Sequence, residues 1–358
     1  MDEQKLCRVF DQAKPSSEQK EAMLTRLLQT ERKGKPMKKL KKLTVIGIAA
    51  ALMIVTCAAA VVTGLDQRLL DYFGAGTEQA ELLSSGVVEV NESHTYDNGW
   101  TVNYGQLLAD RWSVAVMVEV TAPEDFTFVE GGNKFFTVSC DHLDASGEPV
   151  RGDWSAAMTW IEDDDPADNH VTMLWEFSKS SVEEEANEPY TGGYARFILR
   201  RLEQQDGTKL VTFEDWPCTV KLPDTDSGIF CDMGQPITIE GMRLELSTLY
   251  VSPISFRFTL RGAEDDLFSN ISLIADRINF PFDNVGFEVV PNTFLNTDIV
   301  LNLEDGTKIL ADFGGDLKAR MQTEERPSEA LCTYHMSQSP DPAQVVSVTL
   351  FGQTYELR

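Results

Sequence analysis

Histidine, cysteine and acidic side chains are the residues of this chain that could carry out chemistry, and their spacing matches no known catalytic pattern. The 358-residue sequence has four histidines, at His94, His142, His170 and His335. None lies in the HExxH pattern of zinc proteases, and no two have the close spacing of metal ligands. A GxSxG elbow, a P-loop and a dinucleotide-binding fingerprint are also absent from the sequence. We therefore expect a protein that is not an enzyme, with no catalytic residues and no cofactor.

The densest acidic segment is WIEDDDPADNHV, which begins at Trp160. Its carboxylates are hard oxygen ligands of the kind that calcium prefers. The spacing is not that of an EF-hand, and no glycine occupies the turn position. We expect a solvated loop without a metal, and a calcium site on Asp163, Asp165 and Asp168 is the weaker alternative.

Four cysteines follow the long apolar run of the chain, at Cys140, Cys218, Cys231 and Cys332. An oxidising location would permit the bridges Cys140–Cys218 and Cys231–Cys332, although four cysteines allow three connectivities. Buried free thiols are an equally good interpretation, because cysteine also behaves as a small hydrophobic residue. The sequence leaves the pairing open.

The apolar run itself extends from Leu43 to Leu65 without a charged residue. As a helix it would span roughly 34 Å, enough to cross a bilayer core of about 30 Å. A buried globular helix would be expected to have a polar face, which this run lacks. Small residues at Ala58–Ala60 would suit a cleaved signal peptide, but the run is longer than a usual signal core and begins far from the N-terminus. We predict a permanent transmembrane helix over 43–65.

Charge is distributed unevenly about this predicted helix. Of 31 Lys and Arg and 57 Asp and Glu, 12 and 6 precede Leu43, which leaves 19 and 51 after it. Four lysines, Lys38, Lys39, Lys41 and Lys42, stand directly before the run. The positive-inside rule therefore places the N-terminus in the cytoplasm and the acidic C-terminal body outside, as a single-pass cell-membrane protein. The acidic body also disfavours nucleic acid as a partner.

The head before the membrane, residues 1–42, has a helical pattern. The segment PSSEQKEAMLTRLLQ begins with Pro15 and a capping box, and it places Met23, Leu27 and Leu28 on one apolar stripe. A solvated tail that only orients the membrane helix is one interpretation. The other is that Met23, Leu27 and Leu28 bind a cytoplasmic partner as a helix in a groove.

After a juxtamembrane linker or helix at 66–84, the pattern changes to short alternating strands separated by turn residues. The segment GMRLELSTLYVSPISFRFTL, opened by Gly241, aligns without gaps on the segment opened by Gly99. Apolar positions coincide in the two copies, and DGTK also recurs, at Asp206–Lys209 and Asp305–Lys308. We predict a mainly β body of two tandem immunoglobulin-like β-sandwich domains, over 85–224 and 228–358.

The order of these parts resembles a known family. PSSEQKEAMLTRLL, the lysine-flanked run, GLDQRLLDYF and GWTVNYGQLLADRWSVAVMVEVTAP are similar to an uncharacterised family of bacterial membrane proteins, the domain of unknown function 4179. Its members are mostly Gram-positive, often stand beside sigma-factor genes and are described as anti-sigma-factor-like. The resemblance covers residues 4–125, and the later sandwich resembles the immunoglobulin-like domain often appended in such proteins. A zinc-type anti-sigma head would need histidine and paired cysteines, whereas Cys7 is the one such residue before the membrane.

Two functions are consistent with this organisation. In the first, the chain is a single-pass regulator whose outer domains sense or bind an envelope component while the head contacts a sigma factor or another cytoplasmic regulator. In the second, the chain is a membrane-tethered surface binding or structural protein with an inert head, or it is secreted after signal cleavage. The ligand and the oligomeric state do not follow from the sequence.

Overall fold

The computed structural model describes residues 65–75, 77–84, 86–128, 134–150, 154–161, 168–179, 189–204, 207–262, 295–312, 316–320, 328–336 and 338–357. These residues belong to one compact unit, Val55–Arg358. They are mainly β, as the alternating pattern predicts. Within these ranges no helix is both long and apolar enough to cross a membrane. The predicted head 1–42 and the predicted span 43–65, apart from Leu65, lie outside the described residues.

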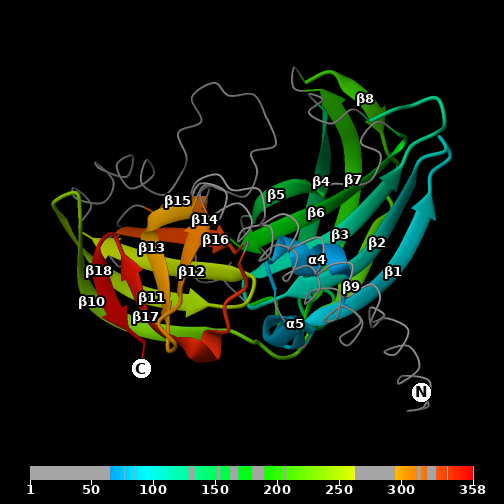
Figure 1. Cartoon of the computed structure of the whole chain (residues 1–358). Coiled ribbons are helices and arrows are strands. Elements are labelled where there is room, and N and C mark those ends of the chain that lie inside the picture. Colours follow the sequence, from blue (N-terminus) through cyan, green and yellow to red (C-terminus); the bar gives the residue numbers. More distant parts are fainter. Residues whose placement is uncertain are drawn as a thin grey trace, which may run out of the picture. The chain divides into compact units, whose positions relative to one another are not determined.

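The first group of strands, called here the first β region, forms two antiparallel sheets. One has the order β1-β2-β3-β6-β5, and the other has the order β4-β7-β8 with β9 also paired to β7 (Figure 1). The strands are β1 (Val87–Thr95), β2 (Thr101–Ala109), β3 (Ser113–Thr121), β4 (Lys134–Leu143), β5 (Trp154–Ile161), β6 (His170–Lys179), β7 (Tyr194–Gln204), β8 (Lys209–Thr212) and β9 (Pro217–Lys221). A hydrophobic core with residues of both sheets includes Tyr104, Val116, Trp175 and Phe197.

The second group, called here the second β region, repeats this plan. Its sheets have the orders β10-β11-β12-β16-β15 and β14-β13-β17-β18. The strands are β10 (Ile229–Ile239), β11 (Met242–Val251), β12 (Ser255–Gly262), β13 (Leu295–Leu303), β14 (Lys308–Asp312), β15 (Asp316–Arg320), β16 (Ser328–His335), β17 (Val345–Leu350) and β18 (Gln353–Glu356), with a 3-10 turn η2 (Pro342–Gln344) before β17. Its own core includes Leu246, Phe256, Phe258, Leu301 and Val348.

The aligned copies occupy equivalent strands. Val114, Val116 and Val118 of β3 are fully buried, as are Phe256, Phe258 and Leu260 of β12. The ladders that join β2 to β3 and β11 to β12 are irregular at the same place, after Tyr104 and after Leu246. The period of two in each copy therefore places matching side chains in two separate cores.

The recurrence of DGTK has a different cause. The first such turn joins β7 to β8, whereas the second joins β13 to β14. In the second β region β13 pairs with β17, as β4 pairs with β7 in the first. Strand β13 is therefore the counterpart of β4, and the second DGTK turn follows β13 rather than the counterpart of β7. Gly207 and Gly306 have φ values of 83° and 84°, which only glycine adopts readily, so the shared letters reflect the same hairpin chemistry.

Two short helices cover the outer face of the first sheet: α4 (Gln67–Tyr72) and α5 (Thr77–Ser84) (Figure 1). Asp66 caps α4, because its carboxylate accepts a hydrogen bond from the backbone N–H of Arg68 at 2.8 Å. Beneath the helices a third cluster of buried residues joins Leu69, Leu70 and Phe73 to Ala115 and Met117 of β3. The face of β3 opposite the valines is therefore buried as well.

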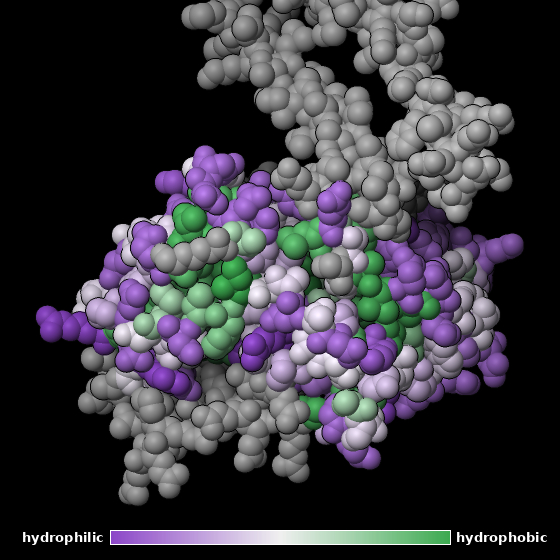
Figure 2. Space-filling view, turned by 90° about the horizontal axis from the view of Figure 1, so that it is seen from below, coloured by the Kyte–Doolittle hydropathy of each residue, from purple (hydrophilic) through white to green (hydrophobic). Residues whose placement is uncertain are grey.

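The apolar surface of the described residues is divided. Figure 2 shows hydrophobic residues in separate areas with hydrophilic residues between them. Phe230 is 42% exposed, and the guanidinium of Arg111 lies 5.2 Å from the centre of its ring.

Residues 222–228 connect the two β regions, and this connection is hydrogen-bonded to Tyr250 and packs against its ring. In this connection Asp226 accepts hydrogen bonds from the Gly228 N–H at 2.9 Å and from the Tyr250 hydroxyl at 2.6 Å. A Cβ atom on Gly228 would lie 2.4 Å from the Tyr250 ring. The connection therefore follows a path that a larger residue would displace.

We expect Gly228→Ala to lower the free energy of unfolding by about 1–3 kcal/mol, because overpacking forces either the Tyr250 ring or the connection to move. Urea denaturation measures this loss. Gly105→Ala is the control, since a Cβ there would lie 3.7 Å from Met117, an ordinary van der Waals contact, and the backbone has no positive φ. A tolerated Gly228→Ala would show that the contact with Tyr250 does not constrain the connection.

Candidate functional site

Two equivalent turns meet where the β regions join. In the β2–β3 turn, the Asp110 carboxylate accepts hydrogen bonds from the N–H groups of Trp112 at 2.7 Å and Ser113 at 2.6 Å. In the β11–β12 turn, the Ser252 hydroxyl oxygen accepts them from Ile254 at 3.2 Å and Ser255 at 2.9 Å. Asp110 and Ser252 are 142 residues apart, which is also the separation of the aligned copies. The two turns thus use the same local bonding with different side chains.

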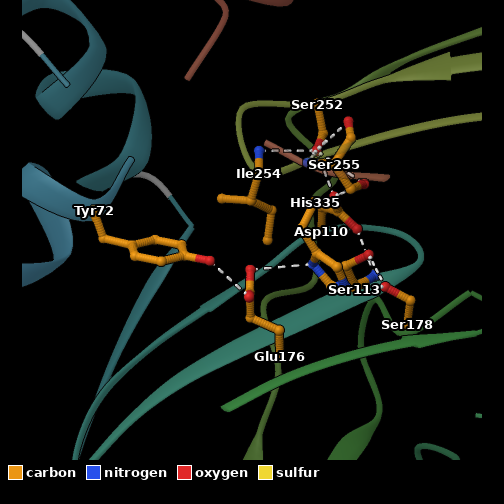
Figure 3. Close-up of polar contacts among 9 residues, drawn as sticks. All are labelled: Tyr72, Asp110, Ser113, Glu176, Ser178, Ser252, Ile254, Ser255 and His335. Atoms are coloured by element: carbon orange, nitrogen blue, oxygen red, sulfur yellow. Dashed lines mark hydrogen bonds and ion pairs between the residues drawn. The ribbon is translucent and has the colours of Figure 1, made fainter. Parts of the chain in front are cut away.

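The turns also bind each other, and this contact forms what is called here the junction. The second oxygen of the Asp110 carboxylate accepts hydrogen bonds from the hydroxyls of Ser252 and Ser255 (Figure 3). Asp110 is 2% exposed. Burial raises the pKa of this carboxyl group, while the four donors oppose that rise. A buried carboxylate of the first β region therefore holds the turns of both regions together.

A second chain of polar contacts continues the junction along the strand ends. Ser113 and Ser178 are paired residues whose hydroxyls lie 3.0 Å apart. The Ser178 hydroxyl lies 3.0 Å from Nε2 of His335, and Nδ1 of His335 lies 3.2 Å from a Glu176 carboxylate oxygen. Figure 3 shows His335 between the two side chains of β6. The imidazole of the second β region thus bridges two residues of the first.

Two of these contacts join a position to its own counterpart in the other copy. Asp110 contacts Ser252, which is its counterpart in the alignment. Ser178 contacts His335. These two are also counterparts, because His335 pairs with Ser255 in its sheet as Ser178 pairs with Ser113. Contacts of this kind are the mark of an isologous interface, in which the same patch is used on both sides. The two β regions are joined as an internal dimer would be.

An apolar residue of each turn also contacts the other β region. Ile254 is buried with Leu108, Ala115 and Met117 on the outer face of the first sheet. Its counterpart Trp112 lies under the guanidinium of Arg257, 4.2 Å from the ring centre, on the outer face of the second sheet. Each turn therefore lies on the sheet of the other region.

Helix α4 contacts both β regions at the junction. The Tyr72 hydroxyl donates to the second Glu176 oxygen at 2.8 Å, and the Phe73 carbonyl accepts from the Ser339 N–H at 2.7 Å. Arg68 pairs with Asp66 and with Glu119 of β3, each at 2.8 Å. Burial opposes ionisation of both carboxyl groups, but their hydrogen bonds and the charge of Arg68 outweigh it, so both pKa values are lowered.

Ser178, His335 and Glu176 have the connectivity of a hydrolytic triad, and their surroundings argue against that role. A nucleophile must reach a substrate carbonyl, whereas Ser178 is 1% exposed and Glu176 is 2% exposed. Ser178 also lies within β6 with its hydroxyl against Ser113. In this arrangement the three residues form a structural polar bridge. The absence of enzymatic activity stays a prediction.

The other three histidines make different contacts. His94 stacks on Trp216 with ring centres 4.6 Å apart, and His142 is buried with its ring 5.0 Å from that of Tyr190. Burial lowers the pKa of His142 to about 4. The backbone N–H of His170 donates to the Asp168 carboxylate at 2.7 Å.

The structure describes one of the three residues of the alternative calcium site, Asp168. Asp163 and Asp165 lie outside the described residues, whereas Asp168 caps the start of β6 through the bond to His170. Over the described ranges, no group of three or more histidine, cysteine or acidic side chains is placed to hold a metal ion. The predicted partner-binding residues Met23, Leu27 and Leu28 also lie outside the described residues.

The four cysteines are not joined by disulfide bonds in the structure. Cys140, Cys218 and Cys332 are buried, and Cys231 is partly buried. Cys140 and Cys218 pair with Phe197 from opposite sides, which puts their Cα atoms about 10 Å apart, beyond the limit of about 7 Å for a bridge. Cys231 and Cys332 are separated by two intervening strands, β11 and β12. Neither predicted bridge fits this register.

The sequence-based search missed Asp110, Glu176, Ser178, Ser252 and Ser255. A signal for three of them exists in the gapless alignment, where DRWS at 110–113 stands over SPIS at 252–255. Both segments place a capping side chain three residues before a serine, which is typical of a tight turn stabilised by its first side chain. Such matching turns would have indicated equivalent loops, although not that the loops touch.

No family model matches this chain, and no curated protein matches it. Among solved structures, the crystal structure of the conserved domain protein from Bacillus anthracis is similar, with 10% sequence identity and a TM-score of 0.43. The similarity covers 70% of this chain and 72% of that chain. A similarity of this extent carries no conclusion about family or activity.

We expect Asp110→Ala to lower the free energy of unfolding by roughly 3 kcal/mol, because it leaves buried hydroxyl and N–H donors of both turns without their acceptor. Chemical denaturation of the full chain measures the loss. Asp144→Ala is the matched control, since that carboxylate also caps a turn, with bonds to Ser146 and Glu148, but is partly exposed to solvent. Equal losses for the two variants would contradict a special role for Asp110.

Acidification should loosen α4. Asp66 and Glu119 have lowered pKa values in the folded protein, so the stability that they contribute is present above the ordinary carboxyl values of about 4 and is lost as the pH falls through the lower folded values. Protection factors of the α4 amides, measured by hydrogen exchange, should fall below about pH 4. Glu119→Gln should weaken that pH dependence, and Asp305→Asn, in the β13–β14 turn, should not. Protection that is independent of pH down to 2 would contradict this account.

Proposed function

We propose that this chain is a single-pass membrane regulator of the anti-sigma-factor-like kind. Two immunoglobulin-like β-sandwich domains stand outside the membrane, where they sense or bind an envelope component. The head contacts a cytoplasmic regulator, with a sigma factor as the first candidate. The lysine-flanked run, the acidic body and the resemblance over residues 4–125 support this proposal.

One structural observation carries the proposal further than the sequence does. Leu65, the last residue of the predicted span, is 3% exposed and is buried in the same cluster as Phe73 and Ile254. The chain that follows the predicted span is therefore packed, from Leu65 on, into a cluster that contains residues of both β regions. A receptor that transmits a state of its outer domains needs such a connection, whereas a simple tether does not.

The surface-protein alternative differs from this proposal in the role of the head. If the head is inert, the apolar stripe of Met23, Leu27 and Leu28 has no partner, and the outer domains act alone. Substitutions in this stripe therefore distinguish the two functions experimentally.

Crosslinking and affinity recovery of the full chain from its own cells should enrich one cytoplasmic protein. Met23→Ser/Leu27→Ser should abolish that enrichment and change transcription of the partner's targets, because an apolar stripe binds through burial of its side chains. Thr25→Ser/Gln29→Ser, at the same spacing on the other side of the predicted helix, is the matched control. If the wild type, the stripe variant and the control variant all recover only background proteins, and transcription is unchanged, the result favours the tethered surface protein.

A further inference from the structure

Helix α4 is too short to be stable by itself. It has six residues, less than two turns, and isolated helices of that length are not stable in water. Its conformation therefore depends on the surfaces that it touches. These surfaces belong to both β regions.

The first β region holds the beginning of α4. Arg68 bonds to Glu119 and, at 3.0 Å, to the hydroxyl of Thr172, while Gln106 accepts from the Asp66 N–H at 2.6 Å. These contacts come from β2, β3 and β6 of one sheet. They are independent of where the second β region lies.

The end of α4 is held in part by the second β region. The Phe73 carbonyl accepts the N–H of Ser339, and the fully buried Phe73 ring shares its cluster with Ile254 of the β11–β12 turn. Tyr72 reaches the second region indirectly, because Glu176 binds Tyr72 through one oxygen and lies beside His335 through the other. Figure 3 shows Glu176 between Tyr72 and His335.

We propose that α4 is a coupling element whose C-terminal half stays docked only while the junction is closed. If the bonds from Ser252 and Ser255 to Asp110 break, Ile254, Ser339 and His335 move away with the second β region. Phe73 then loses the part of its buried cluster that Ile254 supplies, and the buried Glu176 loses the imidazole beside it. The regulatory use of this coupling rests on the proposed function, whereas the coupling itself is a property of the outer body.

Hydrogen exchange on the full chain in detergent tests the coupling. Ser252→Ala/Ser255→Ala removes two hydroxyls that bind Asp110 and are not bonded to α4. We expect exchange at the amides of Phe73 and Ala75, which bond to Leu69 and Leu70, to become at least tenfold faster. Amides in the middle of β3 and β12 should keep their wild-type protection. Thr354→Ala, which removes a hydroxyl bonded to Thr349 in the other sheet of the second region, is the matched control and should change neither set.

A second variant covers the case in which the double variant does not fold. Because coupling is reciprocal, Tyr72→Phe, which removes one hydroxyl from α4, should speed exchange at the Met336 amide, which bonds to Ile254 across the β11–β12 turn. Faster exchange in α4 with no change at Met336, or an opened junction with α4 still protected, would overturn the proposal. Failure to recover a cytoplasmic partner would overturn the regulator and leave the coupling intact, so the two failures are distinguishable.

Discussion

Four hydrogen bonds converge on the buried carboxylate of Asp110, and the arrangement of the two β regions depends on them. Two of the bonds close its own turn, and two come from the other region. The cost of burying the carboxylate is offset only while all four donors are present. Ser178 and His335 bridge the same junction, and Phe73, directly after α4, is bonded to Ser339 of the second region.

Much of the fold could be predicted from the sequence, because the pattern that encodes it is local and repeated. Alternation in β3 and β12 indicated strands, and the gapless alignment indicated equivalent ones. Two predictions were incomplete for physical reasons. The alternation did not show that Ala115 and Met117, on the face of β3 opposite the valines, are buried as well, because α4 and α5 lie over them. DGTK read as part of the repeat, but the same hairpin turn is favoured wherever two strands meet closely.

The site could not be predicted, because its residues are far apart in the sequence and ordinary in type. Asp110 is one of 57 acidic residues, so its chemical type carried no information. Glu176 and His335 come together only through the packing of one β region on the other, which no spacing rule describes. The cysteines illustrate the reverse case, because an oxidising location would permit bridges that the intervening strands prevent, β7 in the first region and β11 and β12 in the second. The predictions for the head and the membrane span stay predictions, since they concern residues outside those described.

The difference between Asp110 and Ser252 also determines which β regions, the two halves of the body, can combine. If two first β regions met through this turn, two carboxylates would face each other in a buried space and repel. If two second regions met there, the hydroxyls would find no carboxylate to accept their hydrogen bonds. Only unlike halves complete the contact. An exchange of halves between two molecules would therefore have to preserve the pairing of first with second, because one like pairing is disfavoured by charge and the other by a missing acceptor.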